Sequence, residues 1–251
     1  KMWHVLSVEQ TAHFLSRGGG IARFGDGEWK LQARVSGVIN KGMEEGSKRL
    51  THKLQQLSRV GNKTALAVHV GSWDLPFCIG MVPIFDANEL KKGSKQFYDF
   101  HVKWRKNFKE ENSGHYFPSG SYCSTSITRP DHRPDLPAEW WLRTWQGFTA
   151  GLRALYVGPD EVPRQSFVYK AIFACAVEVA HVFVPVSKAF ASHDRILAEI
   201  VKTWNDKHLQ VALITAGPLA TVLAAELACL GIRAIDAGHI YKKISQFFSG
   251  A

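Results

Sequence analysis

The chain has 251 residues, of which 45% are hydrophobic and 21% charged, as in ordinary globular proteins. This length supports one domain with a substantial core, and the absence of repeats and low-complexity segments excludes repeat and disordered proteins. The net charge of +9 favours an anionic partner, such as a nucleotide, a nucleic acid or an acidic membrane surface, although a basic surface can also serve solubility alone.

The cysteines lack the C-x-x-C spacing of a metal or redox motif, since they stand at positions 78, 123, 175 and 229. Their use as small apolar residues favours a reducing compartment, and we expect a cytoplasmic protein. The longest apolar run, residues 171–186, is interrupted by Glu178, His181 and Pro185, which argues against a membrane span. The first residue is Lys1 rather than a methionine, so we treat the chain as a single domain, 1–251, that can belong to a larger protein.

The first predicted elements are a helix over residues 8–15 and a strand over residues 21–24. The strand runs into Gly25-Asp26-Gly27-Glu28, whose glycines permit a tight turn and a close approach of the backbone to a ligand. Two carboxylates at this spacing can hold a hard divalent cation, with water and phosphate oxygens completing its shell. Because Asp-Gly is a common turn dipeptide, an ordinary solvated turn is the alternative, and spacing alone favours it.

The middle of the chain is predicted to contain a basic helix over residues 41–60, a strand over residues 64–70 and a helix near residues 97–108. The last helix carries an aromatic stripe with lysines off that face. This pattern favours a packed helix over a surface that meets an acceptor or a membrane.

Residues 114–137 are rich in Ser, Pro, Gly and His and predict a long loop, a feature that is often functional in compact domains. Within it, Arg129 stands beside the hydroxyls of Ser126 and Thr128. An arginine next to hydroxyls can grip a pyrophosphate, but Arg129-Pro130-Asp131 is equally typical of an exposed turn.

Strands and helices alternate through the second half of the chain. Helices are predicted near 140–148 and over 167–179 and 194–204, and strands over 153–158 and 181–186. Lys188 comes just after the strand over 181–186, where a lysine can contact a phosphate or can simply be solvated.

Residues 209–239 predict a compact strand–helix–strand unit. The apolar run 209–215 is typical of a strand that is buried on both faces. Gly217 and Pro218 then begin a helix that Gly231 ends, and the next strand, residues 232–236, leads into Gly238-His239. The free N–H groups and positive dipole end of the helix start suit a phosphate.

This alternation predicts an α/β fold: a mostly parallel, Rossmann-like sheet with helices on both faces. The carboxyl ends of its strands would gather Asp26, Glu28, Lys188, the helix start at 217–218, Asp236 and His239. The two carboxylates, Asp26 and Glu28, suit a metal, and a basic residue together with a helix start suits a diphosphate. We therefore expect an enzyme that handles a nucleoside diphosphate. The sequence lacks G-x-G-x-x-G after a strand and the P-loop pattern, which disfavours dehydrogenases and P-loop kinases, and it lacks G-x-S-x-G and H-E-x-x-H.

Four segments resemble a bacterial family of glycosyltransferases with the GT-D fold, formerly catalogued as a domain of unknown function. They are ARFGDGEW (22–29), SITRPD (126–131), VPVSKAFASHDRIL (184–197) and ITAGPLATVLAAELACLGIRAIDAGHI (214–240). The resemblance implies a single-domain enzyme that moves a sugar from a nucleotide-sugar donor, expected to be a UDP-sugar, to a hydroxyl of a glycan or glycoprotein acceptor. It also implies a D-x-E motif, here Asp26 and Glu28, for Mn²⁺ or Mg²⁺. Residues 40–120 carry little of the resemblance, so acceptor recognition can diverge there.

Site roles follow as hypotheses. The expected contacts to the nucleotide or its diphosphate are Arg23, Arg129, Lys188, Gly217, Pro218, Thr221 and His239. Asp236 and His239 are the candidate catalytic residues: His239 would contact the diphosphate or the metal, and Asp236 would act as a general base on the acceptor hydroxyl, if the stereochemistry inverts. A carboxylate tied into hydrogen bonds at the strand end is the favoured alternative for Asp236.

Two other functions compete with the transferase. A metal-dependent phosphoesterase would hydrolyse a nucleotide sugar as readily without an acceptor as with one. A basic nucleic-acid-binding module, suggested by net charge and the aromatic and basic stretch at 97–109, would bind without metal and weaken steeply with salt.

Overall fold

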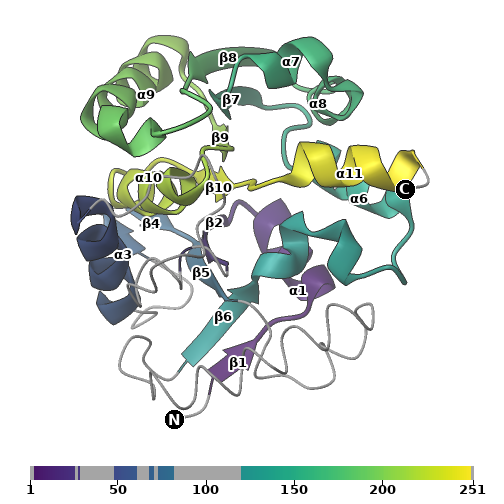
Figure 1. Ribbon diagram of the computed structural model, residues 1–251, viewed down its shortest axis with the longest axis horizontal. Helices are drawn as coiled ribbons and strands as arrows, with labels where there is room; N and C mark the ends of the chain where they lie inside the picture. The colour runs from purple at the N-terminus through teal and green to yellow at the C-terminus, as the bar shows by residue number, and fades with distance from the viewer. Residues whose placement is uncertain are drawn as a thin grey trace.

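The computed structural model describes residues 3–25, 28, 48–60, 68–70, 73–81 and 120–249. An eight-stranded sheet of order β1–β6–β5–β2–β10–β9–β7–β8 forms its centre, and each neighbouring pair is parallel (Figure 1). The strands are β1 (Trp3–Val5), β2 (Gly20–Phe24), β5 (Phe77–Met81), β6 (Gly120–Ser124), β7 (Arg153–Gly158), β8 (Glu178–Phe183), β9 (Val211–Ile214) and β10 (Ala234–Asp236). The predicted α/β class with a parallel sheet is therefore confirmed.

Helices cover both faces of this sheet, and Figure 1 shows the two layers on opposite sides. One layer contains α3 (Lys48–Val60), α9 (His193–Lys207) and α10 (Pro218–Cys229). The other contains α1 (Val8–Ser16), α6 (Ala138–Gly147), α8 (Phe167–Ile172) and α11 (Ile240–Phe248), while the short α7 (Glu161–Gln165) follows β7. Among the described residues, no helix is long and apolar enough to cross a membrane.

Alternation along the strands builds two cores. In β7, Leu155 and Val157 join the core under α9 and α10, whereas Ala154 and Tyr156 join the core under α6, α8 and α11. Successive side chains of a strand point to opposite faces, so a strand covered on both sides must be apolar throughout. All four residues of β9 are buried, which explains the continuous apolar run in the sequence.

The two halves of the sheet meet between β2 and β10, strands that lie far apart in the sequence (Figure 1). From β2 the chain passes to β5 and then β6, away from this seam on one side. On the other side, β9 and β10 bring the chain back to it. In parallel sheets ligands bind outside the carboxyl ends of the strands where the winding direction changes, so the seam marks the expected position of a site.

Two sequence predictions were wrong. The expected loop at 114–137 contains β6 and two 3₁₀ helices, Thr125–Thr128 and Pro130–His132. Tyr122 and Cys123 of β6 are buried, so the strand is covered on both faces. The serines and the glycine around them gave this segment the composition of a loop, and the strand was not predicted. The expected helix over 167–179 ends at Ile172, because the chain from Phe173 onward turns into β8, and an apolar run alone does not separate helix from strand.

Other elements differ less or went unpredicted. Of the expected strand 64–70, the described part is β3 (Val68–Val70), which pairs with β4 (Trp73–Leu75) in a separate antiparallel ribbon. Strands β1 and β5 and helices α7 and α11 were not predicted. The expected helix near 97–108 lies outside the described residues.

Candidate functional site

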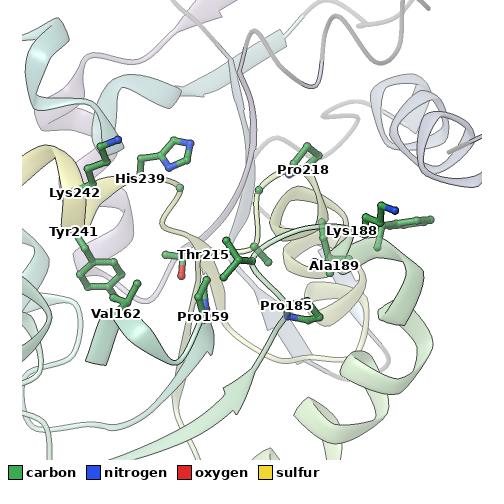
Figure 2. Close-up of a pocket in the computed structure, with 16 residues that line it drawn as sticks. Pro159, Val162, Pro185, Lys188, Ala189, Thr215, Pro218, His239, Tyr241 and Lys242 are labelled. Atoms are coloured by element: carbon green, nitrogen blue, oxygen red, sulfur yellow. The ribbon is translucent and has the colours of Figure 1, made fainter. Parts of the chain in front are cut away.

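A pocket of about 240 Å³ lies above the carboxyl ends of β7, β8, β9 and β10 (Figure 2). Each of these strands is followed by one section of its wall. Pro159 and Val162 follow β7, residues 185–190 follow β8, residues 215–219 follow β9 and residues 238–242 follow β10. The pocket is thus built from segments that the parallel topology brings to one edge of the sheet.

The floor of the pocket is fixed by hydroxyl groups. Thr215 donates a hydrogen bond to the Tyr156 hydroxyl at 3.2 Å, and that hydroxyl donates to the carbonyl of Pro159 at 3.0 Å. A side chain at Gly158 would overlap both hydroxyl groups. The ends of β7 and β9 are therefore held at a fixed spacing beneath any ligand.

Lys188 forms part of one side wall and has a left-handed backbone conformation, with φ 53° and ψ 30°. This conformation is uncommon for a residue with a side chain, and such strain concentrates at functional sites. In the described part of the chain, no carboxylate pairs with Lys188. Its role in phosphate contact stays a prediction, and its position on the pocket wall agrees with that prediction.

The start of α10 forms the next section of the wall. Gly217 has φ 55° and stands at the N-cap without a side-chain capping bond, and Pro218 occupies the first turn. The first turn of a helix exposes N–H groups and a partial positive charge, which suit an anion. Gly217 and Pro218 lie where the sequence placed them, and both line the pocket.

The start of α11 lies across the pocket and adds His239 and Lys242, as Figure 2 shows. Burial of the ring, followed by the positive charges of Arg23 and Arg129, lowers the pKa of His239 below its usual value. His239 is therefore neutral near pH 7 in the free protein. Positive charge close to a neutral histidine marks a place where an added anion would be stabilised.

Asp236 at the end of β10 is buried and hydrogen-bonded. Its carboxylate accepts the N–H of Arg23 at 3.3 Å and the N–H of Gly238 at 3.1 Å, and it lies 3.4 Å from Nε of Arg23. The Thr221 hydroxyl stands 3.1 Å from the same carboxylate and 2.8 Å from the Arg23 carbonyl. These contacts favour the structural role of Asp236 over that of a general base.

Thr221 was expected to contact the nucleotide, but its side chain is fully buried beneath Asp236 and is not part of the pocket lining. In this structure its hydroxyl serves the carboxylate of Asp236 and the end of β2. Arg23 also lies under the β10–α11 turn, because a methyl group at Gly238 would come within 2.5 Å of its guanidinium. Sequence analysis placed Arg23 and Thr221 among the ligand contacts and did not indicate that they support the pocket from below.

Arg129 forms a two-pronged ion pair with Asp131, with N–O distances of 2.9 Å and 2.7 Å. Lys243 of α11 lies 3.3 Å from the same carboxylate. Burial acts to raise the pKa of Asp131, but the bonds from Arg129 and the nearby positive charges outweigh it and hold the pKa well below its usual range. Arg129 is thus engaged locally, outside the pocket lining, and reaches the pocket through its charge on His239.

The predicted metal ligands follow β2 directly. Glu28 is buried, and its Oε2 accepts the N–H of Gly25 at 2.9 Å, while Asp26 lies outside the described residues. The acidic turn therefore begins beside the pair formed by Arg23 and Asp236. Within the described ranges, no cluster of three or more histidine, cysteine, aspartate or glutamate side chains could hold a metal.

Sequence reasoning missed Lys242 and Thr215. Lys242 could have been found by predicting a helix after His239, because a lysine in the first turn of that helix stays beside its start. Thr215 carried no signal, since it closed an apolar strand and its hydroxyl acts through a partner on β7.

Known proteins that are similar to this chain agree on its fold. A structure described as showing that the highly conserved domain of unknown function 1792 has a distinct glycosyltransferase fold is 24% identical, with a TM-score of 0.79 over 99% of this chain and 82% of its own. A structure described as a new glycosyltransferase of this domain type from Streptococcus sanguinis is 22% identical, with a TM-score of 0.81 over 100% of this chain and 86% of its own.

A curated relative, the probable glycosyl transferase Gly of Streptococcus gordonii, is 24% identical over 98% of this chain. The chain spans only 33% of that relative's length. The family model described as Glycosyltransferase GT-D fold matches residues 21–251. The match includes every element that contributes to the pocket, and the chain belongs to the GT-D fold family of glycosyltransferases.

Proposed function

We propose that the chain transfers a sugar from a nucleoside diphosphate sugar, with UDP as the first nucleotide to test, to a hydroxyl of a glycan or glycoprotein acceptor. One observation carries the proposal. In a chain of a glycosyltransferase family, Lys188, His239 and Lys242 surround a pocket at the start of two helices, with Arg23 beneath its edge. This arrangement suits the diphosphate of a donor better than a neutral ligand.

The chemistry follows from where charge develops. As the bond between the sugar and the diphosphate breaks, negative charge accumulates on the departing phosphate oxygen. Fixed N–H groups and cations near that oxygen stabilise the transition state more than the ground state. Lys188 and Lys242 supply mobile positive charge, and the starts of α10 and α11 supply N–H groups whose positions the fold sets.

His239 has a separate role in this proposal. Because its pKa is lowered in the free protein, its neutral ring can donate one hydrogen bond to a phosphate oxygen. The arriving negative charge then favours uptake of a second proton. We assign Asp236 to positioning Arg23 rather than to proton abstraction, because its oxygens already accept hydrogen bonds.

A divalent cation, Mn²⁺ or Mg²⁺, is the expected cofactor, with Asp26 and Glu28 as its ligands. Oε2 of Glu28 accepts the Gly25 N–H, and the expected contact of this carboxylate with the cation is direct or through a water molecule. When bound, the cation would neutralise charge on the diphosphate. Asp26→Ala and Glu28→Ala should each abolish metal-dependent turnover while the protein still folds, and Glu28→Ala should also lower the melting temperature because it removes the acceptor of the Gly25 N–H. Full activity of either variant would contradict the metal assignment.

The donor class can be tested by thermal shift with UDP-, GDP- and dTDP-sugars, each with and without Mn²⁺. We expect one nucleotide to raise the melting temperature, and to do so more strongly with the metal. Product analysis with and without an acceptor separates transfer from hydrolysis, since a phosphoesterase would release the sugar equally fast in both. Failure of all three nucleotides to bind would contradict the proposed site.

A further inference from the structure

His193 is a buried histidine outside the pocket that nevertheless adjoins its wall. It is the first residue of α9, directly after the segment 185–192 that carries Lys188, and its side chain is 2% exposed. Its ring packs against that of Phe190, a pocket residue, with the ring centroids 5.4 Å apart. A displacement of His193 would therefore also displace the part of the pocket wall that contains Lys188.

Both ring nitrogens of His193 face carboxylates. Nδ1 lies 2.7 Å from Oδ1 of Asp194, and Nε2 lies 2.6 Å from Oε2 of Glu226 on α10. Ionised carboxylates only accept hydrogen bonds, so a ring nitrogen that carries a proton donates to the carboxylate that it faces. Through Glu226, the ring forms a bridge between the start of α9 and the middle of α10.

Helix α3 completes this charged cluster. Lys53 pairs with the other oxygen of Glu226 and lies 3.2 Å from Nε2 of His193, and Arg49 pairs with Asp194 at 2.8 Å. The described charged groups that face the ring are thus Asp194 from α9, Glu226 from α10 and Lys53 from α3. Because the His193 ring is buried, removing Glu226 would leave a ring nitrogen without its acceptor where water has little access.

We propose that His193 is a positioning residue for the pocket, whose bridge to Glu226 holds the segment 185–192, and with it Lys188 and Phe190, against helix α10. The expected effect of His193 on nucleotide affinity rests on the proposed function. Its expected effect on the order of residues 185–192 does not. Ligand affinity would depend on this bridge because a wall that is already ordered costs less to fix on binding.

Two substitutions separate the bridge from the rest of the side chain. His193→Gln places an amide near the former Nε2 and can still donate to Glu226. His193→Asn places an amide near the former Nδ1 and can reach only Asp194. Both variants remove the ring and put a neutral amide in its place, so their difference isolates the contact between α9 and α10.

The first measurement is hydrogen–deuterium exchange of residues 185–192 in the protein without ligand. We expect exchange to be about tenfold faster in His193→Asn than in His193→Gln, because only the glutamine retains the bridge. Equal exchange in the two variants would overturn the proposal. Should His193→Asn fail to fold, Glu226→Gln removes the partner's charge instead, and its exchange should exceed that of the wild type; unchanged exchange would overturn the proposal as well.

The second measurement is the dissociation constant of UDP with Mn²⁺, with kcat and KM for the donor where turnover is found. His193→Asn should weaken UDP binding by about tenfold and raise KM while kcat stays nearly constant, and His193→Gln should bind like the wild type. If UDP and the other nucleotides do not bind the wild type, the proposed function fails, while the exchange result still decides the role of His193. Equal affinities in the two variants, with binding intact, would overturn the link to the pocket.

Discussion

In the loop after β6, arginines meet carboxylates at short distances. Arg133, which is almost fully buried, lies 2.7 Å from Glu9 and 2.7 Å from Asp135, and Arg129 pairs with Asp131. Around the pocket the arrangement is the reverse: within the described part of the chain, neither Lys188 nor Lys242 has a carboxylate partner. Positive charge that is neutralised supports the fold, whereas positive charge left without a partner is available to an anionic ligand.

The backbone shows the same contrast. The described residues other than glycine that have positive φ are Lys188 on the pocket wall and His208 at the end of α9. His208 completes a helix C-terminus, a common place for this conformation, whereas Lys188 begins a 3₁₀ helix beside the pocket. A conformational cost at Lys188 is understandable if it directs a functional segment.

Gly238→Ala should have the largest effect on activity. The new methyl group would come within 2.5 Å of the Arg23 guanidinium and displace it, and we expect turnover to fall about 100-fold. Gly231→Ala is the matched control, because Gly231 also has positive φ but an added side chain there meets nothing within 4 Å. Urea denaturation should show a loss of about 1 kcal/mol of stability for Gly231→Ala and a larger loss for Gly238→Ala, which also disturbs the buried pair of Arg23 and Asp236. Similar activity in the two variants would contradict the role given to Arg23.

Lys188→Gly should separate stability from binding. Glycine relieves the left-handed conformation, so the free energy of unfolding should rise by about 1 kcal/mol. Nucleotide affinity should fall about tenfold, because the loss of one charge-assisted contact is expected to cost that much. His208→Gly should give a similar gain in stability without a change in affinity. Unchanged affinity in Lys188→Gly would show that the strain at this position serves the fold alone.

His239→Gln tests the charge around the pocket. Because burial and neighbouring cations lower the pKa of His239, the free ring is neutral near pH 7, and an arriving diphosphate would promote its protonation. Wild-type affinity for the nucleotide should therefore increase about threefold as the pH falls from about 8 to about 6. The variant should lack this increase, and calorimetry in buffers of different ionisation enthalpy should show proton uptake only for the wild type. Identical pH profiles would remove His239 from the ligand contacts.

Glu9→Gln should have the smallest effect, and none on nucleotide binding. The hydrogen bond from Arg133 lowers the pKa of Glu9 to about 2. A carboxylate whose pKa is lowered in the folded protein stabilises the fold at any pH above its pKa in the unfolded chain. This contribution is lost as the pH falls through the folded-state pKa of about 2. Since Glu9 is half exposed, we expect a loss of less than about 1 kcal/mol at neutral pH. Thermal unfolding of the two proteins should converge in strong acid; a constant difference would contradict this account.

The sequence predicts the second half of the molecule well and the first half poorly. The strand over 153–158 and the unit of β9, α10 and β10 were anticipated because continuous apolar runs alternate with clear helix signals there. Strands β1 and β5 are short, and β6 contains serines, so no pattern in their own residues marks them. Their burial depends on partners distant in the chain, which local periodicity does not report.

The candidate site was anticipated to a similar degree. Gly217, Pro218, Lys188 and His239 line a pocket at the carboxyl edge, because parallel topology brings strand ends together, while their ligand contacts stay predictions. The sequence did not indicate that Thr221 would face inward to Asp236, or that Arg129 would pair with its own neighbour. Such side-chain partnerships depend on rotamers and distances that exist only after folding.

The pairing of β2 with β10 has a consequence for how this protein matures. Arg23 and Asp236 are 213 positions apart in the chain, yet they share a backbone hydrogen bond and an ion pair. During synthesis, the acidic turn at residues 25–28 is made long before β10, which pairs with the strand preceding that turn. A chain that lacks β10 therefore cannot form the site. Closure of so long a loop is slow, and the same seam that completes the protein would therefore be among its last parts to form.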